Sequence, residues 1–328
     1  MTISSTKSKN TKQKFQVGEL FAGVGGIGLG FKDAGFDVVW ANEIDANACQ
    51  TYSKNFSHLV INEDMQKVDP AKLPKTDILT GGFPCQAFSV AGYRKGFKDD
   101  RGNLFFDIIR FIKALKPRVV FLENVKNLAA HDHGNTFKII QKELQDAGYM
   151  IKAQVLNTAQ YSEVPQNRER IYIVCFKKKK DYENFKFPKK IDNPRPITDF
   201  IEKTVDDKFY YTHTKYYPEL KREITNPKTV YQWRRQYVRE NKSNLCPTLT
   251  ANMGMGGHNV PLVKDNKDIR KLTPRECARF QGFPDSFILP NDLPMSALYK
   301  QMGNSVSVPV IKAIAKNILV ALKATDGE

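Results

Sequence analysis

The chain has 328 residues, of which 41% are hydrophobic and 26% charged, a balance that is typical of a soluble globular protein and excludes a disordered one. Lys and Arg number 51 against 35 Asp and Glu, and the resulting net charge of +16 favours a polyanionic partner such as nucleic acid. No apolar run approaches a membrane span and the N-terminus carries no secretory signal, so we expect no membrane association.

The five cysteines are an odd number and form no C-x-x-C pair. This pattern argues against a disulfide framework and against a structural zinc site, and it suits a reducing compartment. We therefore expect a cytoplasmic protein without a metal.

The first part of the chain alternates short apolar runs with helical patterns. After a polar, basic tail (1–14) that we expect to be disordered, strands are predicted at 15–23, 36–43, 76–84, 118–125 and 170–176. Helices are predicted at 24–35, 104–117 and 136–148. The alternation predicts a doubly wound α/β domain over residues 1–185, with a mostly parallel sheet and helices on both faces.

The pattern ends at a run of lysines, 177–180. Residues 181–268 carry prolines, aromatic residues and basic residues without clear periodicity, and we interpret this stretch as a second, smaller domain, placed at 186–270, or as a long insertion. Helical signals return in 271–304, which we interpret as a hinge and return segment. Residues 305–328 predict an amphipathic helix that completes the first domain.

A glycine-rich turn follows the first predicted strand. The spacing G-x-G-x-x-G, which lets a ligand approach the backbone closely, is satisfied by Gly23, Gly25 and Gly28. Glu43, at the end of the second strand, can accept hydrogen bonds from both hydroxyls of a ribose. Asp64 and Met65, where a third strand should end, could meet an adenine ring, although a solvated loop carboxylate is the simpler interpretation of Asp64. The motif alone fits NAD as well as S-adenosylmethionine.

Cys85 differs from the other cysteines, which we interpret as small buried hydrophobic residues. It follows Pro84 in a loop at the carboxyl end of a predicted strand, where α/β folds place their chemistry. Glu123 ends another strand and can reach the same crevice, with a solvated or helix-capping carboxylate as the alternative. Arg168 and Arg170 are two residues apart and share one face of an extended segment, with a solvated strand edge as the alternative.

Segments along nearly the whole chain resemble, in order and spacing, the motifs of the bacterial DNA cytosine-5 methyltransferases of restriction-modification systems. They are FAGVGG (21–26), GGFPCQAFS (81–89), ENV (123–125), QNRERIY (166–172), RECARFQGFPD (275–285) and QMGNSVSVPV (301–310). The resemblance implies the S-adenosylmethionine-dependent methyltransferase fold with a smaller target-recognition domain, S-adenosylmethionine as methyl donor, and duplex DNA as partner. It also implies a monomer and leaves room for a cognate restriction endonuclease.

The resemblance implies a covalent mechanism. Cys85 would add to carbon 6 of cytosine and turn the ring into an enamine that attacks the methyl group through carbon 5. Glu123 would bind ring N3 and the exocyclic amine and would protonate N3, which a dry pocket favours. Arg168 would support the pocket, and Arg170 would have a structural role.

In the cofactor site, the resemblance assigns Phe21 to ring stacking, Glu43 to the ribose, and Asn304 to a contact near the methionine. It assigns Asp64 and Met65 to the adenine. Further cofactor contacts are expected from Gly23, Gly25 and Pro84. The sequence departs from the family at Glu19, where many members have Asp, and at Ile44, where an aromatic or acidic residue is frequent.

A target base cannot be reached inside a duplex and must be flipped out, which costs a few kcal/mol. Residues 86–105 resemble the family's mobile loop that closes over this base, with an ordinary surface loop as the alternative. The segment 228–242 has five basic residues against one acidic, interleaved with aromatic residues. We interpret it as a DNA-contacting segment, with small-domain core and a solvated charged face as the alternative. DNA contacts are expected from Gln86, Ser89, Arg170, Arg234, Arg235, Arg239 and Thr248.

The residues leave three alternatives. An oxidoreductase that binds NAD at the glycine turn would leave FPCQ and ENV without a role. An RNA cytosine methyltransferase would share the chemistry, but the large basic recognition region favours duplex DNA. A catalytically silent DNA-binding protein would not need Cys85, Glu123 and Arg168 together.

Overall fold

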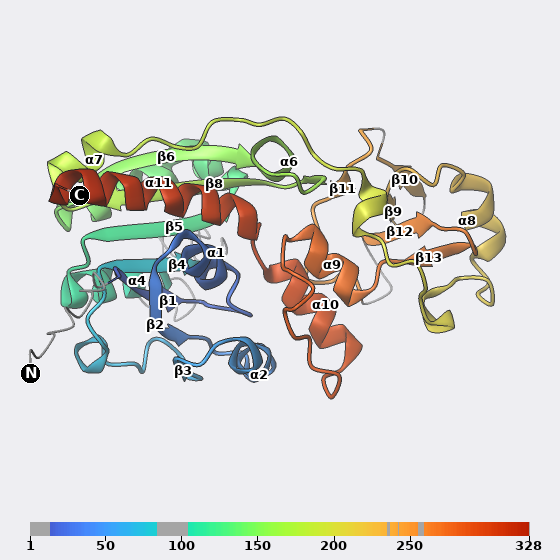
Figure 1. The fold of residues 1–328 in the computed structure, drawn as a ribbon, viewed down its shortest axis with the longest axis horizontal. Coiled ribbons are helices and arrows are strands. Elements are labelled where there is room, and N and C mark those ends of the chain that lie inside the picture. Colours follow the sequence, from blue (N-terminus) through green and yellow to red (C-terminus); the bar gives the residue numbers. More distant parts are fainter. Residues whose placement is uncertain (1–13, 84–103, 235–236, 242, 255–258, 328) are drawn as a thin grey trace, which may run out of the picture.

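The computed structural model describes residues 14–83, 104–234, 237–241, 243–254 and 259–327, and the structural statements below concern these residues. They form a larger part around one sheet and a smaller part around a second sheet, with α9 (Pro274–Phe280) and α10 (Met295–Asn304) between them (Figure 1).

The larger sheet has seven described strands in the order β3-β2-β1-β4-β5-β8-β6. Their bounds are β1 Gln16–Leu20, β2 Asp37–Asn42, β3 Leu59–Ile61, β4 Ile78–Gly82, β5 Val119–Val125, β6 Met150–Asn157 and β8 Glu169–Phe176. The strands from β3 to β5 pair in parallel, whereas β8 is antiparallel to both β5 and β6. The predicted doubly wound, mostly parallel α/β fold is therefore confirmed.

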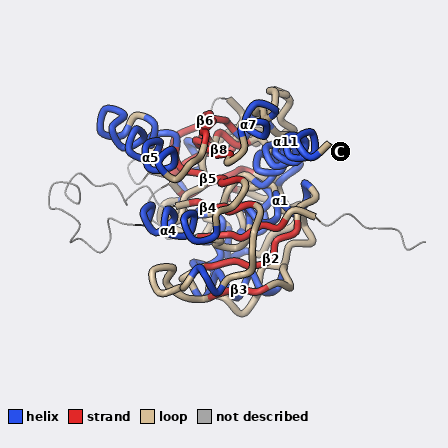
Figure 2. The backbone as a smooth tube through the Cα atoms, turned by 90° about the vertical axis from the view of Figure 1, so that its left-hand side faces the viewer, coloured by secondary structure: helices blue, strands red, loops and turns tan. Residues whose placement is uncertain are grey.

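Helices cover both faces of this sheet (Figure 2). On one face, α11 (Val308–Asp326) packs against α1 (Gly26–Ala34) and α7 (Lys179–Asn184). On the other face lie α4 (Leu104–Leu115) and α5 (Asn135–Asp146), and their apolar residues share a cluster with β4 and β5. Successive strand residues supply opposite faces, since Phe121 packs with α1 and α11 while Val120 and Leu122 pack with α4 and α5.

The smaller part holds a four-stranded antiparallel sheet of described residues, in the order β10-β9-β12-β13. Its strands are short: β9 Tyr231–Trp233, β10 Val238–Glu240, β12 Val260–Lys264 and β13 Ile269–Lys271. Helix α8 (Tyr217–Glu223) covers one face with Leu220, which packs with Trp233 and Leu262.

Short elements complete the described chain. They are α2 (Ala46–Asn55), α6 (Thr158–Tyr161), β7 (Gln166–Asn167), β11 (Cys246–Pro247) and single turns of 3-10 helix at Pro70–Lys72, Lys126–Ala129, His131–Gly134, Ile197–Phe200 and Asp207–Phe209. Strand β7 pairs in parallel with β11, so the chain leading into the larger sheet contacts the chain of the smaller part.

A buried ion pair fixes the smaller sheet to the helices that follow it. Arg270 on β13 donates from both terminal nitrogens to Glu276 on α9, at 2.8 and 2.7 Å, and both side chains are fully buried. Glu276 also completes a capping box with Thr273 at the start of α9. Because the pair joins a strand to a helix, it makes this junction rigid.

The predicted strands appear as β1, β2, β4, β5 and β8, and the predicted helices as α1, α4, α5 and α11. The sequence interpretation missed α2, β6 and the small sheet. The division into domains at 185, 270 and 304 stays a prediction. Among the described residues, one helical stretch, Met295–Asp326, is apolar and long enough to cross a membrane, but 61% of its apolar window is buried inside the protein, as in a core helix.

Candidate active site

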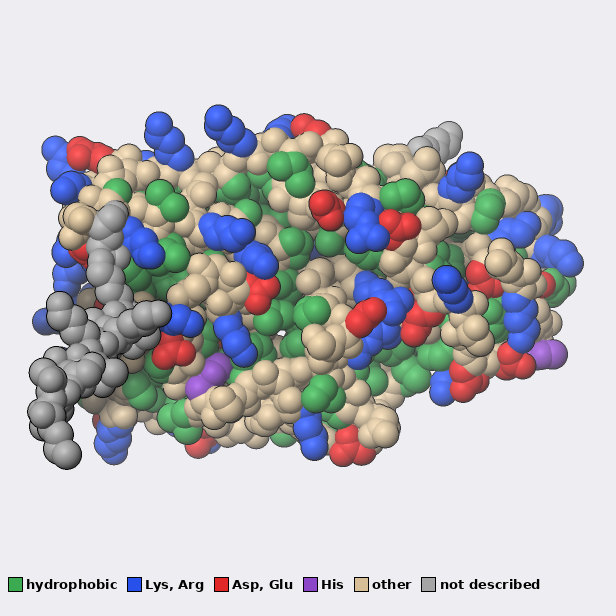
Figure 3. Space-filling model, viewed as in Figure 1, with side chains coloured by type: hydrophobic (Ala, Val, Ile, Leu, Met, Phe, Trp, Pro, Cys, Tyr) green, Lys and Arg blue, Asp and Glu red, His purple; other side chains and the backbone are tan. Residues whose placement is uncertain are grey.

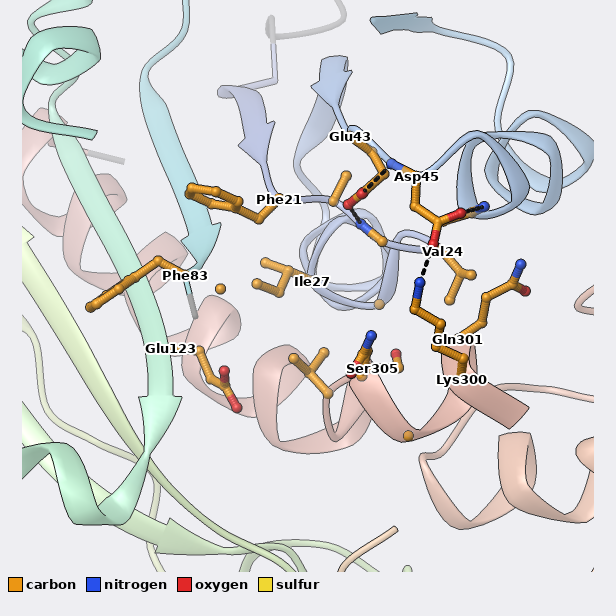
Figure 4. Close-up of a pocket in the computed structure, with 18 of the residues that line it drawn as sticks. Phe21, Val24, Ile27, Glu43, Asp45, Phe83, Glu123, Lys300, Gln301 and Ser305 are labelled. Carbon is orange, nitrogen blue, oxygen red and sulfur yellow. Dashed lines mark hydrogen bonds and ion pairs between the residues drawn. The ribbon is translucent and has the colours of Figure 1, made fainter. Parts of the chain in front are cut away.

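The turn after β1 has an unusual backbone. Phe21, Gly23 and Gly25 all have positive φ, at 52°, 55° and 89°. The turn is held by Glu43, whose carboxylate accepts hydrogen bonds from the N–H groups of Gly23, at 2.7 Å, and Asp45, at 2.8 Å (Figure 4). A Cβ atom on Gly23 would meet nothing within 4 Å, so the space beside this turn is open.

This open space belongs to a cavity of about 420 Å³ at the carboxyl ends of β1, β2, β4 and β5. The side chains of Glu43, Glu123 and Lys300 reach it from different sides (Figure 4). Its lining includes Phe21, Gly23, Val24, Ile27, Glu43, Asp45, Phe83, Glu123, Asn124, Arg168, Arg170, Lys300, Asn304 and Ser305.

A second carboxyl group lies beneath the glycine turn. Glu19 is fully buried, accepts from the Gly28 N–H at 3.0 Å and from the Tyr52 hydroxyl at 3.1 Å. Burial raises the pKa of Glu19 to about 8. A Cβ atom on Gly28 would lie 2.5 Å from the Glu19 carboxylate, so Gly28 serves this packing rather than the cavity.

Glu123 is the buried carboxyl at the other end of the cavity, with 7% of its surface exposed. Its Oε1 lies 3.2 Å from Nε of Arg170, and no described residue donates a hydrogen bond to this oxygen. The two come together because β8 runs antiparallel to β5, which places Arg170 opposite Val125. Beside them, Asn124 donates to the carbonyl of Phe83 at 2.8 Å and ties the end of β5 to the end of β4.

Arg168 has different partners. It is 3% exposed and donates to the carbonyls of Leu249, at 3.2 Å, and of Ser305. Burial, followed by the neighbouring charge of Arg170, lowers the pKa of the Arg168 guanidinium. Arg168 thus ties the strand segment before β8 to the smaller part and to the start of α11.

The predicted site residues fall into four groups. The cavity brings together Phe21, Gly23, Glu43, Glu123, Arg168, Arg170 and Asn304. A second cavity is lined by Arg234, Arg239 and Thr248. Neither cavity is lined by Gly25, Asp64 or Met65; Met65 is buried in the cluster against which Phe21 packs. Outside the described residues lie Pro84, Cys85, Gln86, Ser89 and Arg235.

Sequence reasoning missed an ion pair at the edge of the cavity. Lys300, in the middle of α10, lies 2.8 Å from Asp45, which caps the start of α2. Asp45 follows Glu43 by two residues and Lys300 precedes the QMGN segment, but nothing local in the sequence pairs them. Among the described residues no cluster of His, Cys, Asp and Glu could hold a metal ion.

Comparisons with known proteins agree with one another. Residues 15–320 match the model of the family described as C-5 cytosine-specific DNA methylase. The chain is 56% identical to the type II methyltransferase M.Bsp6I of Bacillus sp. (strain RFL6), over 92% of this chain and 98% of that protein. It is 40% identical to the type II methyltransferase M.HhaI of Haemophilus parahaemolyticus, over 92% of this chain and 93% of that protein.

Solved structures share the fold. The Entamoeba histolytica methyltransferase EhMeth superposes with a TM-score of 0.75 at 18% identity, over 95% of this chain and 100% of that one. A putative DNA modification methyltransferase from E. coli superposes with a TM-score of 0.68 at 24% identity, over 96% of this chain and 100% of that one.

Proposed function

Because the chain belongs to the C-5 cytosine-specific DNA methylase family, and so is a DNA cytosine-5 methyltransferase of the restriction-modification type, we propose that it works through a covalent adduct with Cys85. In this proposal the enzyme takes a methyl group from S-adenosylmethionine and places it on carbon 5 of a cytosine flipped out of duplex DNA.

One observation carries the proposal: Oε1 of Glu123 is buried beside Arg170 and accepts no hydrogen bond from any described residue. A buried carboxylate oxygen without a hydrogen bond is costly, and native proteins keep such groups where a ligand completes them. The exocyclic amine of cytosine offers the donor that this oxygen lacks, and ring N3 can accept a proton from the carboxyl group. Arg170 faces the same carboxyl from the side and holds its orientation.

The rest of the cavity fits S-adenosylmethionine. Glu43 is already oriented by two backbone N–H groups and has lone pairs left for ribose hydroxyls. The open space at Gly23 lets a ligand approach the backbone, Phe21 offers a ring face, and Asn304 faces the cavity from the end of α10. We assign Asp64 and Met65 to the adenine only through their place after β3. S-adenosylmethionine, when bound here, supplies the methyl group on a sulfonium.

Cys85 is the proposed nucleophile. The chain reaches the cavity at Phe83, which lines it, and Cys85 comes two residues later, outside the described part. Cysteine is the most nucleophilic common side chain once ionised. Its thiolate forms a bond to carbon 6 while Glu123 gives a proton to N3, and the electrons of the 5,6 double bond make carbon 5 nucleophilic. After carbon 5 is methylated it loses its proton, the double bond forms again, the thiolate leaves and N3 returns its proton to Glu123.

Arg168 is a positioning residue in this scheme. Its two carbonyl contacts hold the segment from which Arg170 reaches Glu123, and they connect that segment to the smaller part. The smaller part, residues 186–270, is the proposed reader of the target sequence. Basic side chains spread over both parts of the molecule on the face shown in Figure 3, which suits long-range attraction to duplex DNA. We further propose a monomer that acts in the cytoplasm beside a restriction endonuclease for the same site.

Duplex DNA with 5-fluorocytosine at the target base tests the covalent mechanism. Cys85 can still add to carbon 6 and carbon 5 can still be methylated, but fluorine cannot leave carbon 5 as a cation. The protein should therefore remain attached to methylated DNA, and the adduct should survive denaturing electrophoresis.

The adduct should accumulate only with S-adenosylmethionine and should be absent in Cys85→Ser. Mapping it to another cysteine would refute the assignment of Cys85 but not the reaction. If no adduct forms on DNA that is a substrate in its unfluorinated form, the covalent mechanism is wrong.

A further inference from the structure

The smaller part contains a second cavity, of about 240 Å³, that the proposed chemistry does not use. Its lining is mainly polar and basic and includes Asn167, Gln232, Arg234, Arg239, Asn241 and Thr248. None of its described lining residues is acidic, so the cavity suits a ligand that presents hydrogen-bond acceptors.

The alternation of β9 builds this cavity. Tyr231 and Trp233 point into the small hydrophobic core under α8, whereas Gln232 and Arg234 line the cavity on the opposite face. Strand β10 adds a second arginine, because Arg239 is the antiparallel partner of Gln232. The sheet thus separates an apolar face, which stabilises the fold, from a polar face, which is available for binding.

Arg234 is held in one orientation. Its Nη2 donates to Oε1 of Gln232 at 3.2 Å, and Gln232 is itself only 6% exposed. The Nε of Arg234 is buried and finds no acceptor among the described residues. A buried N–H without an acceptor costs free energy, which a ligand with a matching acceptor would recover. Arg239, by contrast, is exposed.

The second cavity adjoins the first. Asn167 lines the second cavity and Arg168, the next residue, lines the first, as expected for consecutive residues of an extended segment. Across from them, Thr248 donates to the carbonyl of Asn167 at 2.7 Å, while Arg168 donates to the carbonyl of Leu249. One pair of neighbouring segments therefore forms the wall between the two cavities.

An oriented guanidinium recognises paired acceptors in one plane. In the major groove, guanine offers such a pair at O6 and N7, whereas each of the other bases offers no more than one acceptor there. Phosphate also binds arginine, but phosphate contacts need no recessed side chain fixed by a buried glutamine, and the exposed Arg239 suits that role better.

We propose that Arg234, oriented by Gln232, reads the O6 and N7 edge of a guanine in the target sequence. This inference rests on the proposed function, since it takes duplex DNA as the substrate. It makes Arg234 a specificity-determining residue and leaves Arg239 as a contact to the phosphate backbone.

The test pairs a protein change with a base change. Once bisulfite sequencing has identified the methylated sequence, duplexes are made in which each guanine of the site is replaced singly by 7-deazaguanine, which lacks the N7 acceptor, or by inosine, which keeps both acceptors. At one position, 7-deazaguanine should lower kcat/KM of the wild type by roughly 10- to 150-fold, the range of one hydrogen bond to a charged group, and inosine should not. In Arg234→Ala, activity on natural DNA should fall to a similar extent, and 7-deazaguanine at that position should cause little further loss.

Arg239→Ala is the matched control. It should weaken binding about equally for all duplexes and should lower the slope of log Kd against log salt by about 1. The inference is wrong if 7-deazaguanine is as harmful to Arg234→Ala as to the wild type at every position, or if Arg234→Ala weakens all sequences equally. A wild-type enzyme that forms no adduct with 5-fluorocytosine would refute the covalent mechanism and leave the base-reading result intact, so the two failures are distinguishable.

Discussion

Glu19→Gln should stabilise the protein at neutral and alkaline pH. Glu19 is fully buried under the glycine turn, and burial raises its pKa from an ordinary 4.5 to about 8. Between these values the native state holds a proton that the unfolded chain has lost, so the wild type loses stability as pH rises. The amide of Gln keeps both contacts, because its oxygen can accept from Gly28 N–H and its NH2 can donate to the Tyr52 hydroxyl. That hydroxyl can then donate to His58, 2.8 Å away.

The expected magnitude follows from linkage. Each pH unit between the two pKa values lowers the free energy of unfolding of the wild type by about 1.4 kcal/mol relative to a side chain that does not titrate. From pH 5 to pH 8, the free energy of unfolding of Glu19→Gln should therefore rise by about 4 kcal/mol relative to that of the wild type. Below about pH 4 the two proteins should respond to pH alike, because Glu19 then holds its proton in both states.

Urea unfolding at several pH values measures this difference. In a Trp233→Phe background, the fluorescence of Trp40, which is fully buried on β2, reports the larger part alone. Glu63→Gln, at an exposed carboxylate, is the matched control and should show no such pH-dependent gain. A difference between Glu19→Gln and the wild type that stays constant from pH 5 to pH 8 would mean that Glu19 is ionised in the native protein, and the reasoning would fail.

Three further predictions concern the nucleophile, the net charge and the junction. Cys85→Ser should abolish methyl transfer in a labelled-donor assay and leave DNA affinity largely intact, and turnover within roughly tenfold of the wild type would remove Cys85 from its role. DNA affinity should fall steeply with salt if the +16 charge serves the phosphate backbone, and a nearly flat log–log plot would contradict this. Arg270→Ala should lower the free energy of unfolding by about 3–5 kcal/mol, because it leaves the charge of Glu276 buried without its partner. Combining Arg270→Met with Glu276→Leu should recover part of this loss in urea unfolding, since it removes the unpaired charge but also the capping box.

The larger sheet could be predicted from the sequence because its signals are local. Strand β5 begins with the continuous apolar run VVFL, β4 begins with two buried apolar residues, and α1 ends where Gly35 takes a φ of 105°. Helix α2 was missed because it is polar and lacks an apolar stripe, and it is fixed by Asp45 at its start and by contacts from α10. Strand β6 was missed because it is the last strand of the sheet, where several of its side chains remain exposed and no apolar run forms.

The small sheet could not be predicted from its sequence, because three of its four described strands have only three residues and carry no periodicity. They exist through pairing between distant segments, as where Trp233 pairs with Val260. The same limit applies to the sites. The segment around Arg234 is visibly basic and aromatic, but only the pairing of β9 with β10 and the contact to Gln232 distinguish a half-buried arginine from an exposed one.

Arg168 and Arg170 look alike in the sequence, and only their contacts in the structure distinguish them. Replacing each with lysine should separate their roles. Arg168→Lys loses a guanidinium that serves two buried carbonyls, each costing about 1–3 kcal/mol when left unpaired, so the free energy of unfolding should fall by roughly 2–6 kcal/mol. Arg170→Lys keeps a positive charge beside Glu123 but loses the planar group that orients it, so kcat should fall while stability changes little. Urea unfolding and single-turnover methylation on the same two variants measure both effects. If Arg168→Lys proves stable but inactive while Arg170→Lys remains fully active, the group that orients Glu123 is Arg168, and the assignment made from the β5–β8 pairing is reversed.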